Sequence, residues 1–103
     1  MRMLMKISMA VDKSNAAIKS GALQRTLQST MEALKPEAAY FFPQGGERGG
    51  LLVVDMTASS QIVEIAERFF FGLNAKVEMM PVMALEDLEQ GLSSIQGIVQ
   101  RYG

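Results

Sequence analysis

The first residues of the chain alternate between two kinds of position. Between Met3 and Met9 every second residue is large and apolar, whereas the residues between them include Lys6 and Ser8. This period of two predicts a β-strand, because successive side chains of a strand point to opposite faces of a sheet. The sequence VDKSN (residues 11–15) then supplies turn and cap residues, so a helix is expected to begin just after it.

A helical period replaces this alternation from Ala16 to Leu34. One apolar stripe accounts for it: Ile18, Leu23, Leu27, Met31 and Leu34. Gly21 weakens the predicted helix, and Pro36 ends it because proline has no backbone N–H and fits poorly in a helix interior.

Two apolar runs predict a β-hairpin in the middle of the chain. They are AAYFFP (residues 38–43) and LLVVDM (residues 51–56). The sequence between them, QGGERGG (residues 44–50), contains four glycines. Such a connection is typical of a hairpin with a loose loop.

The second half of the chain predicts another helix, a fourth strand and a C-terminal helix. The first of these opens at TASSQ (residues 57–61) and has the stripe Ile62, Ile65, Ala66, Phe69 and Leu73. The sequence AKVEMMPVM (residues 75–83) predicts the strand, and residues 85–101 a weaker helix. The order is β-α-β-β-α-β plus a C-terminal helix. It matches ferredoxin-like α+β folds, whose four-stranded antiparallel sheet has the first and third strands at its centre.

The C-terminal helix has apolar residues at alternating spacings of three and four: Leu85, Leu88, Leu92, Ile95, Val99 and Tyr102. This is the heptad pattern of a coiled-coil seam. Gly91 and Gly97 each cost about 1 kcal/mol relative to alanine in a helix, so the helix needs a partner surface. We expect residues 85–99 to pack on the sheet edge or a helix of a second subunit, or on its equivalent helix.

Alternation along the strands assigns two faces to the sheet. One face is wholly apolar and should be covered by helices: Met3, Met5, Ile7, Met9, Leu52, Val54, Met56, Val77, Met79, Pro81 and Met83. The opposite, mixed face carries Leu4, Lys6, Ser8, Leu51, Val53, Asp55, Lys76, Glu78, Met80 and Val82. If the mixed face were exposed to solvent, its apolar residues would form a larger patch than monomers usually expose. A homodimer would bury it through Leu4, Lys6, Leu51, Val53, Asp55, Met80 and Val82, together with the C-terminal helix.

Two sequences add a resemblance to a known group of proteins. LKPEAAYF (residues 34–41) and LNAKVEMMPVM (residues 73–83) resemble the entries into the second and fourth strands of the dimeric α/β-barrel superfamily, in particular its small members. The resemblance extends from about Met3 to Leu92. It implies ferredoxin-like domains whose sheets pair across a two-fold axis. The superfamily includes cofactor-free monooxygenases, haem-degrading enzymes and muconolactone-isomerase-like proteins, each with its own active-site residues.

Composition indicates the domain organisation of the chain and excludes several kinds of active site. With 103 residues, 49% hydrophobic and 20% charged, the chain is expected to form one domain, with its core at about residues 3–83 and the C-terminal helix at about residues 85–101. Histidine and cysteine are absent, which excludes a histidine base, a His/Cys metal site and a haem-ligating histidine. We expect no cofactor and no metal.

Charge and hydropathy exclude two classes of partner. The net charge is −1 and there is no basic block, so nucleic acid is not an expected partner. No apolar stretch approaches the roughly 20 residues of a membrane span, and the N-terminus lacks the pattern of a signal peptide. A soluble cytoplasmic protein is expected.

The polar residues of the mixed face allow two interpretations. Lys6 and Asp55, expected on neighbouring central strands, could form an ion pair that sets the register of the dimer. Alternatively, Ser8, Glu78 and this pair form the polar end of a cavity, in which Asp55 or Glu78 is a general base and Lys6 holds an anion.

For three further residues the sequence allows more than one role. Tyr40 is either an edge-strand aromatic that donates its hydroxyl to water or a group that orients an aromatic substrate. Arg48 belongs either to a simple turn or to an anion-binding loop. Phe70, within a run of three phenylalanines, is expected in the core, at a cavity rim or in a subunit contact.

The sequence therefore predicts a homodimeric barrel protein that binds a small apolar or aromatic metabolite. Its nine methionines suggest an adaptable apolar wall for such a ligand. One alternative is a cofactor-independent monooxygenase or isomerase that uses Tyr40, Asp55 and Arg48, although no nucleophile–base pair is recognisable. A second alternative is a purely structural oligomerisation module. The expected ligand-binding residues are Lys6, Ser8, Glu78 and Phe70.

Overall fold

A computed structural model describes all 103 residues as an α+β fold with one four-stranded antiparallel sheet. The elements are β1 (Arg2–Met9), α1 (Val11–Ser20), α2 (Ala22–Leu34), β2 (Ala38–Gln44), β3 (Glu47–Asp55), α3 (Gln61–Leu73), β4 (Lys76–Pro81), α4 (Leu85–Leu92) and α5 (Ile95–Tyr102). The strands lie in the order β2-β3-β1-β4, so β1 and β3 are central and β2 and β4 are edges. The α+β class with its four-stranded antiparallel sheet is confirmed, and the arrangement is compatible with a ferredoxin-like fold. The structure has five helices where three were predicted.

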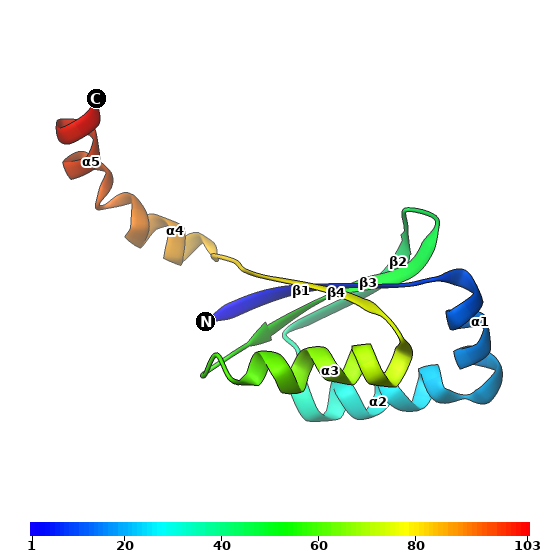
Figure 1. Cartoon of the computed structure of the whole chain (residues 1–103). Helices are drawn as coiled ribbons and strands as arrows, with labels where there is room; N and C mark the ends of the chain where they lie inside the picture. The colour runs from blue at the N-terminus through cyan, green and yellow to red at the C-terminus, as the bar shows by residue number, and fades with distance from the viewer.

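Helices α1, α2 and α3 cover one face of the sheet, and the opposite face is open (Figure 1). The covered face is the apolar one predicted by alternation. Its central strands are buried: Met3, Met5, Ile7 and Met9 of β1, and Leu52 and Val54 of β3. These side chains pack with Ile65, Phe69 and Leu73 of α3 in a single core. At the end of β4 the prediction was wrong, because Pro81 and Met83 are exposed.

The first predicted helix begins earlier than expected and is divided in two. VDKSN forms the first turns of α1: the Ser14 N–H donates to the carbonyl of Ala10 at 2.9 Å, and its hydroxyl donates to the carbonyl of Val11 at 3.1 Å. Gly21 then adopts a φ of 82°. This left-handed conformation, which suits glycine, ends α1 and lets α2 begin in a new direction.

The hairpin between β2 and β3 is tighter than predicted. Both strands extend into the glycine-rich sequence, and only Gly45 and Gly46 form the turn. Their φ angles are 59° and 78°, the two positive values that a common type of two-residue hairpin turn requires. Because Gly49 and Gly50 lie within β3, a loop that cradles an anion is not formed here.

The C-terminal segment forms an arm that points away from the body. Residues 85–102 comprise α4 and α5, divided at Ser93–Ser94, where a single helix was predicted. Figure 1 shows this arm, in orange and red, leaving the end of β4 on the open side of the sheet. The molecule measures 59 × 28 × 20 Å and has a radius of gyration of 17.3 Å. A compact domain of this length has about 13 Å. No helix is both long and apolar enough to cross a membrane.

Candidate functional site

A groove of about 290 Å³ lies between the β2–β3 hairpin and helix α2. Most of the residues that line it are apolar, and the other three are Ser8, Arg48 and Gly49. The apolar residues are Ile7, Met9, Leu23, Leu27, Phe41, Phe42 and Pro43. Small-molecule sites typically have about 300–1,000 Å³ and a few polar groups on an apolar wall. The groove is therefore of a size and character that suit a molecule of one or two rings.

Two glycines of β3, in or beside the groove, have no room for a side chain. A Cβ atom on Gly49 would lie 2.5 Å from the carbonyl oxygen of Ile7, and it would also meet the amide of Gln44, which donates to this oxygen at 2.9 Å. A Cβ atom on Gly50 would lie 2.6 Å from the carbonyl oxygen of Tyr40 and 2.8 Å from the ring of Phe41. The Phe41 ring, which lines the groove, thus packs over the backbone of Gly50.

Arg48 is the one cation in this lining. Its Nη1 donates to the hydroxyl of Ser14 at 2.6 Å and to Oδ1 of Asn15 at 2.8 Å, both on α1. These partners are neutral, and Arg48 forms no ion pair. They hold the guanidinium at the rim of the groove while leaving its charge uncompensated. An anionic substituent on an apolar ligand would meet this charge.

The three residues predicted to be catalytic do not lie together. Tyr40 is 67% exposed and belongs to the open face, through its pairing with Leu51. Arg48 belongs to the covered face, where it pairs with Met9. Asp55 ends the same strand, roughly 23 Å from Arg48 at the usual rise of a strand. A single chain therefore does not assemble the constellation that the oxygenase or isomerase hypothesis requires.

Asp55 interacts with the N-terminus and not with Lys6. Its Oδ1 accepts a hydrogen bond from the ammonium of Met1 at 2.9 Å. This bond and the positive charge of the ammonium lower the pKa of Asp55 below its usual value. The predicted Lys6–Asp55 pair is wrong because the antiparallel register places Arg2 opposite Asp55 and Leu51 opposite Lys6.

Three of the predicted ligand-binding residues do lie together, on the open face near the hairpin. Lys6 is opposite Glu78, and Ser8 is opposite Lys76. The hollow that they line has a volume of about 80 Å³. This space is sufficient for a few water molecules but not for a metabolite. The fourth residue, Phe70, is 42% exposed on α3 and takes no part in this hollow.

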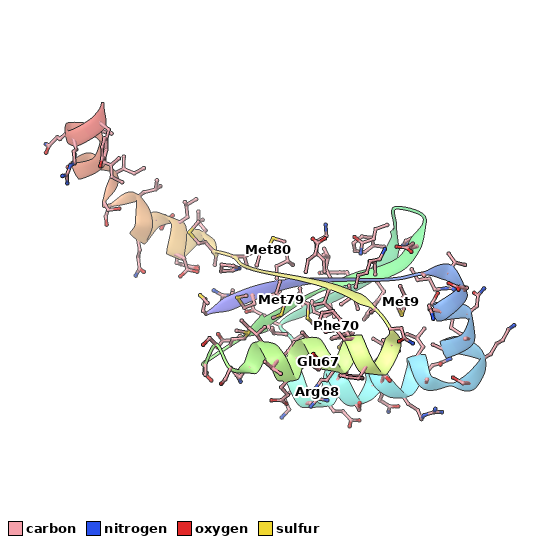
Figure 2. All side chains as sticks on the ribbon, viewed as in Figure 1. Met9, Glu67, Arg68, Phe70, Met79 and Met80 are labelled. Atoms are coloured by element: carbon pink, nitrogen blue, oxygen red, sulfur yellow. The ribbon has the colours of Figure 1, made fainter.

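The labelled side chains of Figure 2 show how the two faces and the groove are separated. Met79 and Met80 leave β4 on opposite sides, Met79 toward the helices and Met80 toward the open face. Phe70 lies on α3, whereas Met9, which lines the groove, lies near α1. Neither Phe70 nor Met80 therefore contributes to the groove.

Four of the ten groove residues, Ile7, Met9, Leu23 and Leu27, were assigned to the apolar face or the helical stripe by the sequence pattern. Leu23 and Leu27 belong to the predicted helical stripe, but they remain partly exposed beside the groove. The available signal was the pair Gly49–Gly50 next to an apolar run, since glycine within a strand often marks a close approach of backbone or ligand. No protein-family model and no curated protein sequence matches this chain.

Proposed function

We propose that this protein is a homodimer of the dimeric α/β-barrel type that binds a small apolar or aromatic molecule in the groove beside α2. The groove carries the binding proposal, because apolar side chains from β1, β2 and α2 surround a space of about 290 Å³ with a single cation at its rim. An aromatic ring would contact Phe41 and Leu27. An acidic substituent on this ring would face Arg48.

The open face of the sheet supports the homodimer. Across its middle, Leu4 pairs with Val53 on one side and with Met80 on the other. Its charges are of both signs, since Lys6 lies opposite Glu78. A second copy of the same face would offer apolar surface to apolar surface and an opposite charge for each of these two residues. Two ferredoxin-like sheets stacked in this way would form the barrel.

Binding can be tested with 1-anilinonaphthalene-8-sulfonate, an aromatic anion whose fluorescence rises in apolar sites. We expect saturable binding to the wild type. Leu27→Trp places a large ring in the groove and should weaken binding by about tenfold or more, equivalent to about 1.4 kcal/mol. Arg48→Leu should weaken binding of this anion but not that of the neutral dye Nile red.

Two controls separate the groove from other apolar surfaces. Val63→Trp introduces the same ring on α3, where Val63 is 67% exposed and outside the groove, and should leave binding unchanged. Met80→Lys disrupts the open face and should also leave dye binding unchanged. If Leu27→Trp binds the dye as tightly as the wild type does, the groove is not the site. The purely structural oligomerisation module would then be the better hypothesis.

A further inference from the structure

The C-terminal arm exposes the apolar residues of the heptad pattern. Its six residues are all at least 42% exposed: Leu85, Leu88, Leu92, Ile95, Val99 and Tyr102. At the division between the two helices, Ser93 and Ser94 keep right-handed helical angles, with φ of −62° and −88°. Their N–H groups donate to the carbonyls of Gln90 and Gly91 at 3.2 Å. The arm therefore consists of two helical segments joined by a tight turn, and each segment exposes three residues of the stripe.

The exposed area of the chain shows how much surface remains to be covered. The accessible surface is 7,019 Å². A compact monomer of 11.3 kDa exposes about 5,700 Å², so the excess is about 1,300 Å². A stable protein–protein interface buries about 800 Å² on each partner. The open face and the arm together therefore supply more than enough surface for a stable dimer.

The charges of the arm lie away from its apolar stripe. When Leu85, Leu92 and Val99 occupy the a positions of a heptad and Leu88, Ile95 and Tyr102 the d positions, Glu86, Asp87 and Arg101 occupy the outer positions b and c. Only Glu89 flanks the seam, at an e position. In a parallel pair its counterpart across the seam is Ala84, so no like charges oppose each other.

Contacts at the base of the arm join it to β1. The N–H of Ala84 donates to Oδ2 of Asp87 at 2.9 Å, and the same carboxylate lies 3.6 Å from Nη1 of Arg2. The N–H of Val82 donates to the carbonyl of Arg2 at 3.1 Å. These contacts join the start of α4 to β1 and leave the arm extended on the open side of the sheet (Figure 1).

We propose that the arms of two copies pack against each other through this seam, parallel and in register. This inference rests on the proposed pairing of open faces. It also requires one of two possible directions of the two-fold axis. With a two-fold axis parallel to the strands, both arms leave the dimer at the same end and can meet across the axis. With the axis perpendicular to the strands they would leave at opposite ends and could not meet. A seam of fewer than three heptads needs this support from the paired sheets, because short helices are marginal alone.

Cysteine cross-linking tests the register, because the wild-type chain has no cysteine. A parallel, in-register pair places each a residue opposite its own copy, within reach of a disulfide. We expect Leu85→Cys, Leu92→Cys and Val99→Cys to oxidise rapidly to covalent dimers. Glu86→Cys and Gln100→Cys, on the outer side of the arm, are the matched controls and should react at least about tenfold more slowly.

Other outcomes would overturn the proposal. An antiparallel pair would cross-link near the middle of the arm, so failure of both Leu85→Cys and Val99→Cys excludes the parallel arrangement. A chain ending at Ala84 should dimerise at least about tenfold more weakly in analytical ultracentrifugation; an equally tight dimer excludes arm pairing altogether. The truncated chain should still bind 1-anilinonaphthalene-8-sulfonate, so a failure of arm pairing and a failure of the groove proposal are distinguishable.

Discussion

At the scale of single residues, the glycines of the β2–β3 hairpin are structural requirements of two different kinds. Gly45 and Gly46 form the turn through positive φ angles, whereas Gly49 and Gly50 have no room for a Cβ atom. By contrast, a Cβ atom on Gly97 of α5 would meet nothing within 4 Å. Identical substitutions should therefore have opposite effects at different glycines.

Gly50→Ala should lower the free energy of unfolding by about 1–3 kcal/mol, because the added methyl group would meet the backbone of Tyr40. Gly97→Ala should leave it unchanged or raise it by up to about 1 kcal/mol, since alanine favours a helix. Urea unfolding followed by circular dichroism measures both. Equal effects of the two substitutions would contradict the close strand approach.

Asp55 provides a prediction about pH. The ammonium of Met1 lowers the pKa of Asp55 in the folded protein, so the carboxylate stabilises the fold fully above its unfolded pKa. This contribution is lost as the pH falls through the lower, folded value. It should be small, because both groups are exposed. NMR titration should show the Asp55 pKa below that of an ordinary aspartate, and N-terminal acetylation should raise it. An unchanged pKa on acetylation would contradict the interaction.

At the scale of elements, backbone conformation decides where the helices and strands begin and end. Gly21 separates α1 from α2, and Asn74 ends α3 with a φ of 52°. The two-residue turn at Gly45–Gly46 holds the register of β2 on β3, which brings Phe41 over Gly50. The turn therefore influences the groove although neither of its glycines lines it.

Gly45→Asn should preserve the hairpin, because asparagine followed by glycine is a favoured two-residue turn of this kind. Gly46→Val should destabilise the protein by at least about 1 kcal/mol, since a β-branched residue is strained at positive φ. Thermal unfolding followed by circular dichroism compares the two variants. Similar melting temperatures would show that the turn adopts another conformation in solution.

At the scale of the whole molecule, the unusual feature is how little of the chain is buried. Only 16 of 103 residues are buried, and the arm contributes none of them. The open face and the arm both lie on the side of the sheet that carries no covering helices (Figure 1). This distribution is typical of one half of an assembly.

A dimer predicts a melting temperature that depends on protein concentration. Each tenfold dilution reduces the contribution of association by about 1.4 kcal/mol, so the melting temperature of the wild type should fall by several degrees. Leu51→Lys should weaken this dependence, because it places a charge within the proposed contact. Val63→Lys, on exposed α3, is the matched control and should retain it. A melting temperature that is constant over roughly a hundredfold dilution would contradict the homodimer.

The sequence by itself determined the class of fold and the composition of the core. Strict alternation in β1 and in the second half of β3 identified the buried residues of the covered face, because burial on one side of a sheet requires apolar side chains at every second position. The predicted stripe of α3 is buried at Ile65, Ala66, Phe69 and Leu73, but its first residue, Ile62, is exposed. Arg48 was a candidate site residue from the sequence, but it was placed in a loop and without its partners Ser14 and Asn15.

Only the tertiary structure decided which residues lie together. The register of β1 on β3 separated Lys6 from Asp55, and the length of β3 separated Asp55 from Arg48. The groove depends on Leu23 and Leu27 of α2 lying beside residues of β1, β2 and β3. A periodic pattern reports the environment of each side chain but not its neighbours. Those neighbours follow from the pairing register of the strands and the placement of the helices, which depend on the packing of the whole chain.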